Sequence, residues 1–106
     1  MAVIGSFTKT DKGWAGKLQT LMIRGTEIRI EKADSLPNER SPDYRVFFGT
    51  VEVGAGWTKE GQSGGTYVSL QIDDPLFPAP LFANLVFSRE RDEAALLWNR
   101  PKPKRD

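Results

Sequence analysis

The chain has 106 residues, a length that suits one domain with a single hydrophobic core. Hydrophobic residues make up 39% and charged residues 27%, which is far from a disordered composition, and a net charge of +1 gives no overall attraction to nucleic acid or anionic membranes. Because the chain contains neither cysteine nor histidine, disulfides, cysteine nucleophiles, serine triads and histidine-bound metals are excluded.

The first third of the chain alternates apolar and polar residues in short runs, which predicts antiparallel strands. A strand over 3–9 is followed by the turn residues Asp11-Lys12-Gly13 and by a second strand over 14–23. A third strand over 26–32 alternates regularly and places Ile28 and Ile30 on one face. The segment from 33 to 42 contains two prolines and predicts a loop.

Strands are also predicted over 44–48, 50–59, 67–72 and 81–87, and residues 94–98 form a last strand or a helical turn. Three prolines between residues 74 and 80 interrupt the ladder before 81–87, which is apolar on both faces and is predicted to be a central strand. The predicted fold is all-β, a small antiparallel β-sandwich or open barrel of about six to eight short strands. Residues 1–99 form this single domain, and 100–106 are a flexible, disordered basic tail.

The sequence favours a cytoplasmic location. No stretch approaches the ~20 apolar residues that a membrane span requires, and the N-terminal residues lack a basic segment followed by an apolar one. The absence of cysteine fits a reducing compartment.

Asp73 and Asp74 are the one carboxylate pair that suggests catalysis, as a site for a divalent cation in a hydrolase. Neighbouring strand residues point to opposite faces, and Pro75 follows, so a turn-capping role is favoured over a metal site. Gly54-Ala55-Gly56 lacks the spacing of a phosphate-binding loop and is expected to allow close packing. We therefore expect no enzyme activity, cofactor or metal, with the hydrolase as the weakest alternative.

Aromatic and basic residues give the first binding hypothesis. Tryptophans in a small domain mostly fill the core, but Trp14 lies beside glycines and lysines and is expected to be exposed, where it could stack on a base. Basic residues of neighbouring segments would contact phosphates, although Glu27, Glu31 and Asp43 dilute that face. The tail would add salt-dependent contacts, or serve only solubility. The candidate nucleic-acid residues are Trp14, Lys17, Arg24, Arg45, Lys102, Lys104 and Arg105.

The second hypothesis is a protein-interaction module. Leu76 and Phe77 lie on a proline-stiffened segment that could present a preorganised apolar anchor to a partner, with core packing as the alternative role of Phe77. Edge strands of the predicted sheet could also pair two copies into a homodimer.

Several segments, in the same order along the chain, resemble the domain-of-unknown-function family 736. They are Ile4-Gly5-Ser6-Phe7-Thr8-Lys9, Pro42-Asp43-Tyr44-Arg45-Val46-Phe47, the glycine-alanine segment ending at Trp57, Leu70-Gln71-Ile72-Asp73-Asp74-Pro75, Pro78-Ala79-Pro80-Leu81-Phe82-Ala83-Asn84-Leu85 and Leu97-Trp98-Asn99-Arg100-Pro101. This family comprises small bacterial proteins, often encoded on plasmids or integrative elements beside conjugative-transfer genes, and has no established activity.

The resemblance implies mobile-element biology without a mechanism. Combined with the residue analysis, it leads us to expect a non-enzymatic binding module for plasmid maintenance or transfer, which contacts single-stranded DNA or a DNA-processing protein. The alternative is an adaptor or inhibitor of a host or plasmid complex.

Overall fold

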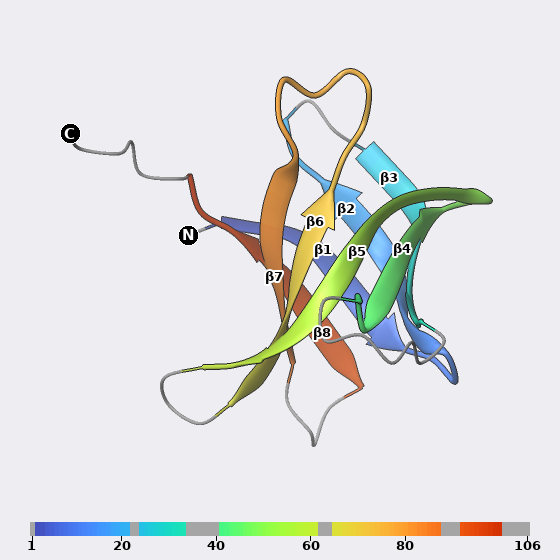
Figure 1. Cartoon of the computed structure of the whole chain (residues 1–106), viewed down its shortest axis with the longest axis vertical. Helices are drawn as coiled ribbons and strands as arrows, with labels where there is room; N and C mark the ends of the chain where they lie inside the picture. Colours follow the sequence, from blue (N-terminus) through green and yellow to red (C-terminus); the bar gives the residue numbers. More distant parts are fainter. Residues whose placement is uncertain (1, 22–23, 34–40, 62–64, 88–91, 101–106) are drawn as a thin grey trace.

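A computed structural model of the chain describes residues 2–21, 24–33, 41–61, 65–87 and 92–100. Over these residues, eight antiparallel strands follow one another and close into a barrel through the pairing of the first strand with the last (Figure 1). The strands are β1 (Ala2–Lys9), β2 (Gly13–Gln19), β3 (Arg24–Lys32), β4 (Tyr44–Phe48), β5 (Val51–Glu60), β6 (Thr66–Ile72), β7 (Leu81–Phe87) and β8 (Glu93–Trp98).

The all-β prediction is confirmed, and the barrel rather than the sandwich is the architecture. Residues 94–98 belong to a strand and not to a helical turn, and β2 is shorter than predicted because it ends at Gln19. The described residues contain no apolar helix of membrane-spanning length. Most of the predicted loop over 33–42 and the predicted disordered tail beyond residue 100 lie outside the described residues.

Closure of the barrel changes the expected route to a homodimer. Each described strand has a hydrogen-bonded neighbour on both sides, because β1 pairs with β2 and with β8. A closed sheet presents no edge strand for pairing with a second copy. The predicted dimerisation through edge strands is therefore not offered by the described part of the chain.

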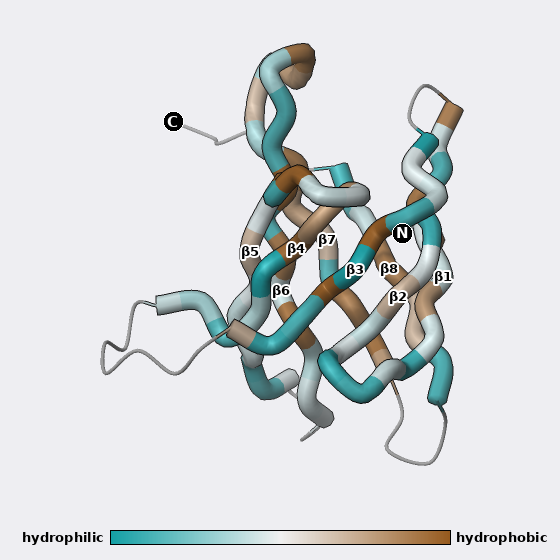
Figure 2. Tube along the Cα trace, turned by 90° about the vertical axis from the view of Figure 1, so that its right-hand side faces the viewer, coloured by the Kyte–Doolittle hydropathy of each residue, from teal (hydrophilic) through white to brown (hydrophobic). Residues whose placement is uncertain are grey.

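The core fills the inside of the barrel. Alternate residues of each strand point inward, and the most deeply buried side chains are 1% exposed or less: Ile30, Val46, Val68, Leu70, Leu85 and Leu96. Figure 2 shows the alternation along β3, where hydrophobic positions are separated by hydrophilic ones. Eight strands enclose a space that side chains can fill completely, so the middle of the barrel is packed.

Gly56 allows β5 to pass close to β6 inside the barrel. A Cβ atom added to Gly56 would lie 2.6 Å from Leu70 Cδ2 and 2.8 Å from Val68 Cγ1. Both of these side chains belong to the core, so a larger residue at position 56 would displace them. The expectation that the glycine-alanine segment serves close packing is confirmed.

Candidate functional site

One end of the barrel is open and apolar. The connections between β2 and β3, between β4 and β5, and between β6 and β7 meet at this end, around a hollow of about 540 Å³. We call this hollow the barrel mouth. Its lining is apolar except for the main chain and three charged residues, and consists of Leu18, Arg24, Gly25, Ile28, Phe48, Val53, Ile72, Asp73, Asp74, Leu76, Phe77 and Leu81.

The loop between β6 and β7, residues 73–80, is held in shape by its two aspartates. Asp73 Oδ1 accepts a hydrogen bond from the Asp74 N–H at 2.9 Å, and Asp74 Oδ2 accepts one from the Leu76 N–H at 2.9 Å. The Phe77 N–H donates to the Asp74 carbonyl at 2.9 Å, which closes the turn. The prediction that Asp73 and Asp74 cap a turn is confirmed.

Leu76 and Phe77 have different environments within this loop. Phe77 is half-buried and packs against the core, whereas Leu76 is 91% exposed at the mouth. Leu21 in the β2–β3 connection is also exposed, as are Phe48 and Val51, which flank the β4–β5 turn, and Phe48 lines the mouth as well. Exposed apolar residues that gather around a hollow indicate an interaction surface, unlike the same residues scattered singly.

Trp14 is not exposed, and the prediction that it is available for base stacking is wrong. Its side chain is 5% exposed, and its ring centroid lies 5.2 Å from that of Phe87. Trp14 is two positions from Gly16 and four from Leu18 on β2, and this alternation turns all three toward the inside of the barrel. A Cβ atom added to Gly16 would meet the Ser6 carbonyl and Phe7 on β1, so this glycine serves the close approach of two strands and is no sign that Trp14 is exposed.

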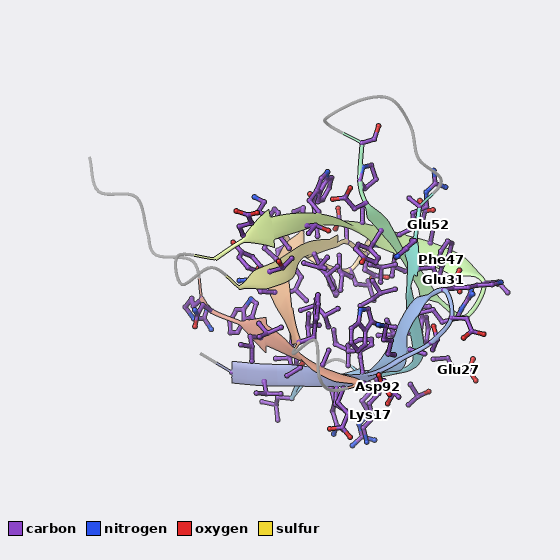
Figure 3. All side chains as sticks on the ribbon, turned by 90° about the horizontal axis from the view of Figure 1, so that it is seen from below. Lys17, Glu27, Glu31, Phe47, Glu52 and Asp92 are labelled. Atoms are coloured by element: carbon purple, nitrogen blue, oxygen red, sulfur yellow. The ribbon has the colours of Figure 1, made fainter. Side chains whose placement is uncertain are left out.

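The described residues of the predicted basic face lie on three neighbouring strands. Lys17 is exposed on β2, Arg24 lines the barrel mouth at the start of β3, and Arg45 lies on β4. The Arg45 Nη1 atom is 3.5 Å from Glu52 Oε1, so its charge is partly balanced. Figure 3 shows Lys17 apart from the group formed by Glu31, Phe47 and Glu52. Lys102, Lys104 and Arg105 lie outside the described residues.

Acidic residues on the surface between these cations balance part of the positive charge. Arg29 on β3 bonds Glu31 Oε2 at 2.8 Å and the Gly49 carbonyl at 2.9 Å, and its guanidinium lies 5.1 Å from the Phe47 ring centroid. Its contacts fix the turn between β4 and β5. This side of the barrel therefore carries mixed charge and a structural arginine instead of a continuous positive face.

No cluster of three or more acidic residues that could bind a metal ion occurs in the described ranges. One oxygen of Asp73 and one of Asp74 accept main-chain hydrogen bonds within their own turn. The arrangement can therefore hold a loop in one conformation, and it does not bring together an acid, a base and a nucleophile.

A second surface was missed by the sequence analysis, which noted that β7 is apolar on both faces and predicted a central strand. The outward side chains of β7 are instead open to solvent, with Phe82 55% and Val86 43% exposed. Beside them runs a hollow of about 450 Å³, which we call the β7 groove. The signal in the sequence was the lack of charge, since β6 and β7 contain no charged residue and β8 contains only Glu93.

A family model described as "Protein of unknown function (DUF736)" matches residues 3–101, nearly the whole chain. The resemblance seen in the sequence is therefore confirmed. No match was found among curated proteins or among solved structures.

Proposed function

The chain belongs to the DUF736 family of proteins of unknown function, and from its geometry we propose that it is a non-enzymatic module that binds an apolar segment of a partner protein. The proposed site is the barrel mouth, with Leu76 as the anchor that enters the partner and the hollow as the space that receives the partner's side chains.

The exposure of Leu76 carries this proposal. A leucine side chain that is 91% exposed adds almost nothing to the stability of the fold. Three hydrogen bonds and three prolines nevertheless hold its loop beside an apolar hollow. A segment that is ordered before binding loses less conformational entropy when a partner docks. Apolar anchors of this kind, placed near a desolvated pocket, supply much of the binding energy of protein interfaces.

The nucleic-acid alternative has less support at the residues first considered. Trp14 is buried and presents no stacking face, and the charge of Arg45 is partly balanced by Glu52 at 3.5 Å. Catalysis has less support as well, since the sequence has no histidine or cysteine and both aspartates at the mouth cap their turn.

The biological setting is part of the proposal. We propose that the protein acts in the cytoplasm, which the absence of cysteine favours, and that it is encoded on a bacterial plasmid or integrative element, as the family resemblance implies. Its partner would then be a protein of a DNA-transfer complex or of a host complex that the mobile element must adapt to or inhibit.

The test compares two matched variants in partner binding. A partner captured with the full chain is purified, and its dissociation constant is measured with wild type, Leu76→Asp and Val86→Asp. Both substitutions place a carboxylate at an exposed aliphatic position, but only Leu76 lines the mouth. We expect Leu76→Asp to weaken binding by about 30-fold or more and Val86→Asp to bind as wild type. Equal affinities for wild type and Leu76→Asp would refute the proposal.

A further inference from the structure

The outward side of β6, β7 and β8 is a nearly uncharged surface, which we call the neutral face. Alternate residues of these strands point outward, and among them only Glu93, at the start of β8, carries a charge. Phe82 and Val86 on β7 are open to solvent. The wall formed by β3, β4 and β5, in contrast, carries the ion pairs of Arg29 and Arg45. Exposed aromatic and aliphatic side chains without charge are typical of the centre of a protein–protein interface.

Bulky and small side chains face each other across β7. At the level of Val86, the strand register places Tyr67 of β6 on one side and Ala95 of β8 on the other. Tyr67 lines the β7 groove, whereas Ala95 lines a neighbouring hollow of about 680 Å³ that also borders Val86. Two residues earlier on β7, Ser69 of β6 and Leu97 of β8 flank the strand in the reverse order. Each bulky side chain therefore has a small counterpart at its own level.

A second copy turned by 180° about an axis parallel to β7 fits this pattern. The rotation exchanges the two sides of the neutral face, so that β6 of one copy lies over β8 of the other. Tyr67 of each copy then enters the hollow over Ala95 of the other, and Leu97 lies over Ser69. The neutral face is therefore complementary in shape to itself.

Asn84 favours a second copy over another apolar partner. It is exposed in the middle of β7, and its side chain has no hydrogen-bond partner within the described residues. An apolar partner would bury this amide unpaired, which costs free energy. On the two-fold axis, in contrast, the amide of each copy donates a hydrogen bond to the amide oxygen of the other.

The charges that border the neutral face are also placed for a second copy. Lys59 of β5 lies directly opposite Tyr67, beyond one side of the face, and Glu93 precedes Ala95 by two residues on the other side. Both are exposed, and neither makes an ion pair within the described residues. Three strand spacings, about 14 Å, separate β5 from β8, so the two side chains cannot pair within one copy. The rotation brings Lys59 of each copy beside Glu93 of the other.

We propose that the protein forms a two-fold symmetric dimer through the neutral face. Phe82, Asn84 and Val86 of the two copies meet along the axis. The contact uses the outer wall of the barrel instead of strand edges, and it goes beyond the function proposed for the barrel mouth. Three strands of this length offer roughly 300–400 Å² of flat surface per copy, less than the ~800 Å² of a standard interface. We therefore expect a reversible dimer with a micromolar dissociation constant.

The test is sedimentation equilibrium of the full chain from about 1 μM to 1 mM, where wild type should show a monomer–dimer equilibrium. Asn84→Asp places two carboxylates against each other on the axis and should weaken the dimer about 10-fold or more. Lys17→Glu is the control, because Lys17 is exposed on β2 outside the neutral face, and it should dimerise as wild type. Thermal melts of each variant separate loss of the dimer from loss of the fold.

A charge exchange tests the orientation of the two copies. Lys59→Glu and Glu93→Lys should each weaken the dimer about 3- to 10-fold, because each ion pair occurs twice in the symmetric interface. The double variant should recover the wild-type affinity, which an effect within one copy would not produce. A monomer over the whole concentration range, or equal dimerisation of wild type and Asn84→Asp, would overturn the proposal. Failure of the double variant to recover affinity would overturn the two-fold arrangement.

Discussion

The Asp74 carboxylate accepts a hydrogen bond of 2.9 Å from the main-chain N–H of Leu76. This bond joins a residue that shapes the loop to the residue that the loop exposes. Because the Asp74 carbonyl also accepts from the Phe77 N–H, one residue fixes both the apolar anchor outside and the aromatic ring that packs against the core. Presentation of Leu76 therefore depends on Asp74.

Asp74→Ala should loosen the β6–β7 loop. Loss of the side-chain acceptor should lower the free energy of unfolding by about 1 kcal/mol and weaken partner binding, because the loop must then be ordered on docking. Asp74→Asn is the matched variant, since its amide oxygen can still accept from the Leu76 N–H. Urea unfolding and partner titration check both effects, and equal behaviour of the Ala and Asn variants would contradict the capping role.

Leu76→Ser should leave the stability of the protein almost unchanged. The side chain is 91% exposed, so its removal should alter the free energy of unfolding by less than about 0.5 kcal/mol. Urea unfolding measures this, with Leu85→Ala as a contrast, because Leu85 is fully buried and its truncation should cost about 2–5 kcal/mol. A large loss of stability in Leu76→Ser would mean that this side chain serves the fold.

Gly56→Val should destabilise the barrel. Any side chain at position 56 meets Leu70 and Val68 inside the core, and overpacking of this kind costs about 1–3 kcal/mol. Gly65→Val is the matched control, because a Cβ added at Gly65 meets no atom within 4 Å. Thermal and urea unfolding of the two variants compare the sites, and equal stabilities would contradict the packing described for β5.

Tyr44 should make the protein less stable in alkaline solution. Its partial burial, and to a lesser degree the Asp43 charge, raise the pKa of the phenol above its ordinary value of 10.0. Above that value the unfolded chain loses the proton while the folded chain keeps it, so the contribution of this group is present below pH 10 and is lost as the pH rises through the folded pKa.

Urea unfolding across this alkaline range should therefore show a steeper fall in stability for wild type than for Tyr44→Phe. Asp43→Asn should give an intermediate slope, because it removes the charge while its amide oxygen can still accept from the Thr58 N–H. Identical slopes for wild type and Tyr44→Phe would show that Tyr44 does not contribute.

Local patterns were enough to predict the strands and the capped turn. The alternation of apolar and polar residues predicted which positions of β3 point inward. The two aspartates before Pro75 predicted the capped turn. Barrel closure was not predictable, because the pairing of β1 with β8 joins opposite ends of the chain.

The two errors about exposure have one physical cause. Which face of a strand becomes the inside is decided by the whole barrel, so flanking glycines could not show that Trp14 points inward. For the same reason, the apolar residues on both faces of β7 predicted a central strand and did not reveal that Phe82 and Val86 face solvent. Apolar character alone does not separate a core position from an interaction surface.

Site-specific photo-crosslinking in bacterial cells tests the central claim most directly. A photoreactive phenylalanine analogue replaces Leu76 at the barrel mouth, and in a second protein it replaces Thr8, which is exposed on β1 away from the mouth. The account predicts a discrete protein adduct from position 76 that is absent from position 8 and is reduced by Phe48→Ser within the mouth. No adduct from position 76, or the same adduct from both positions, would contradict it.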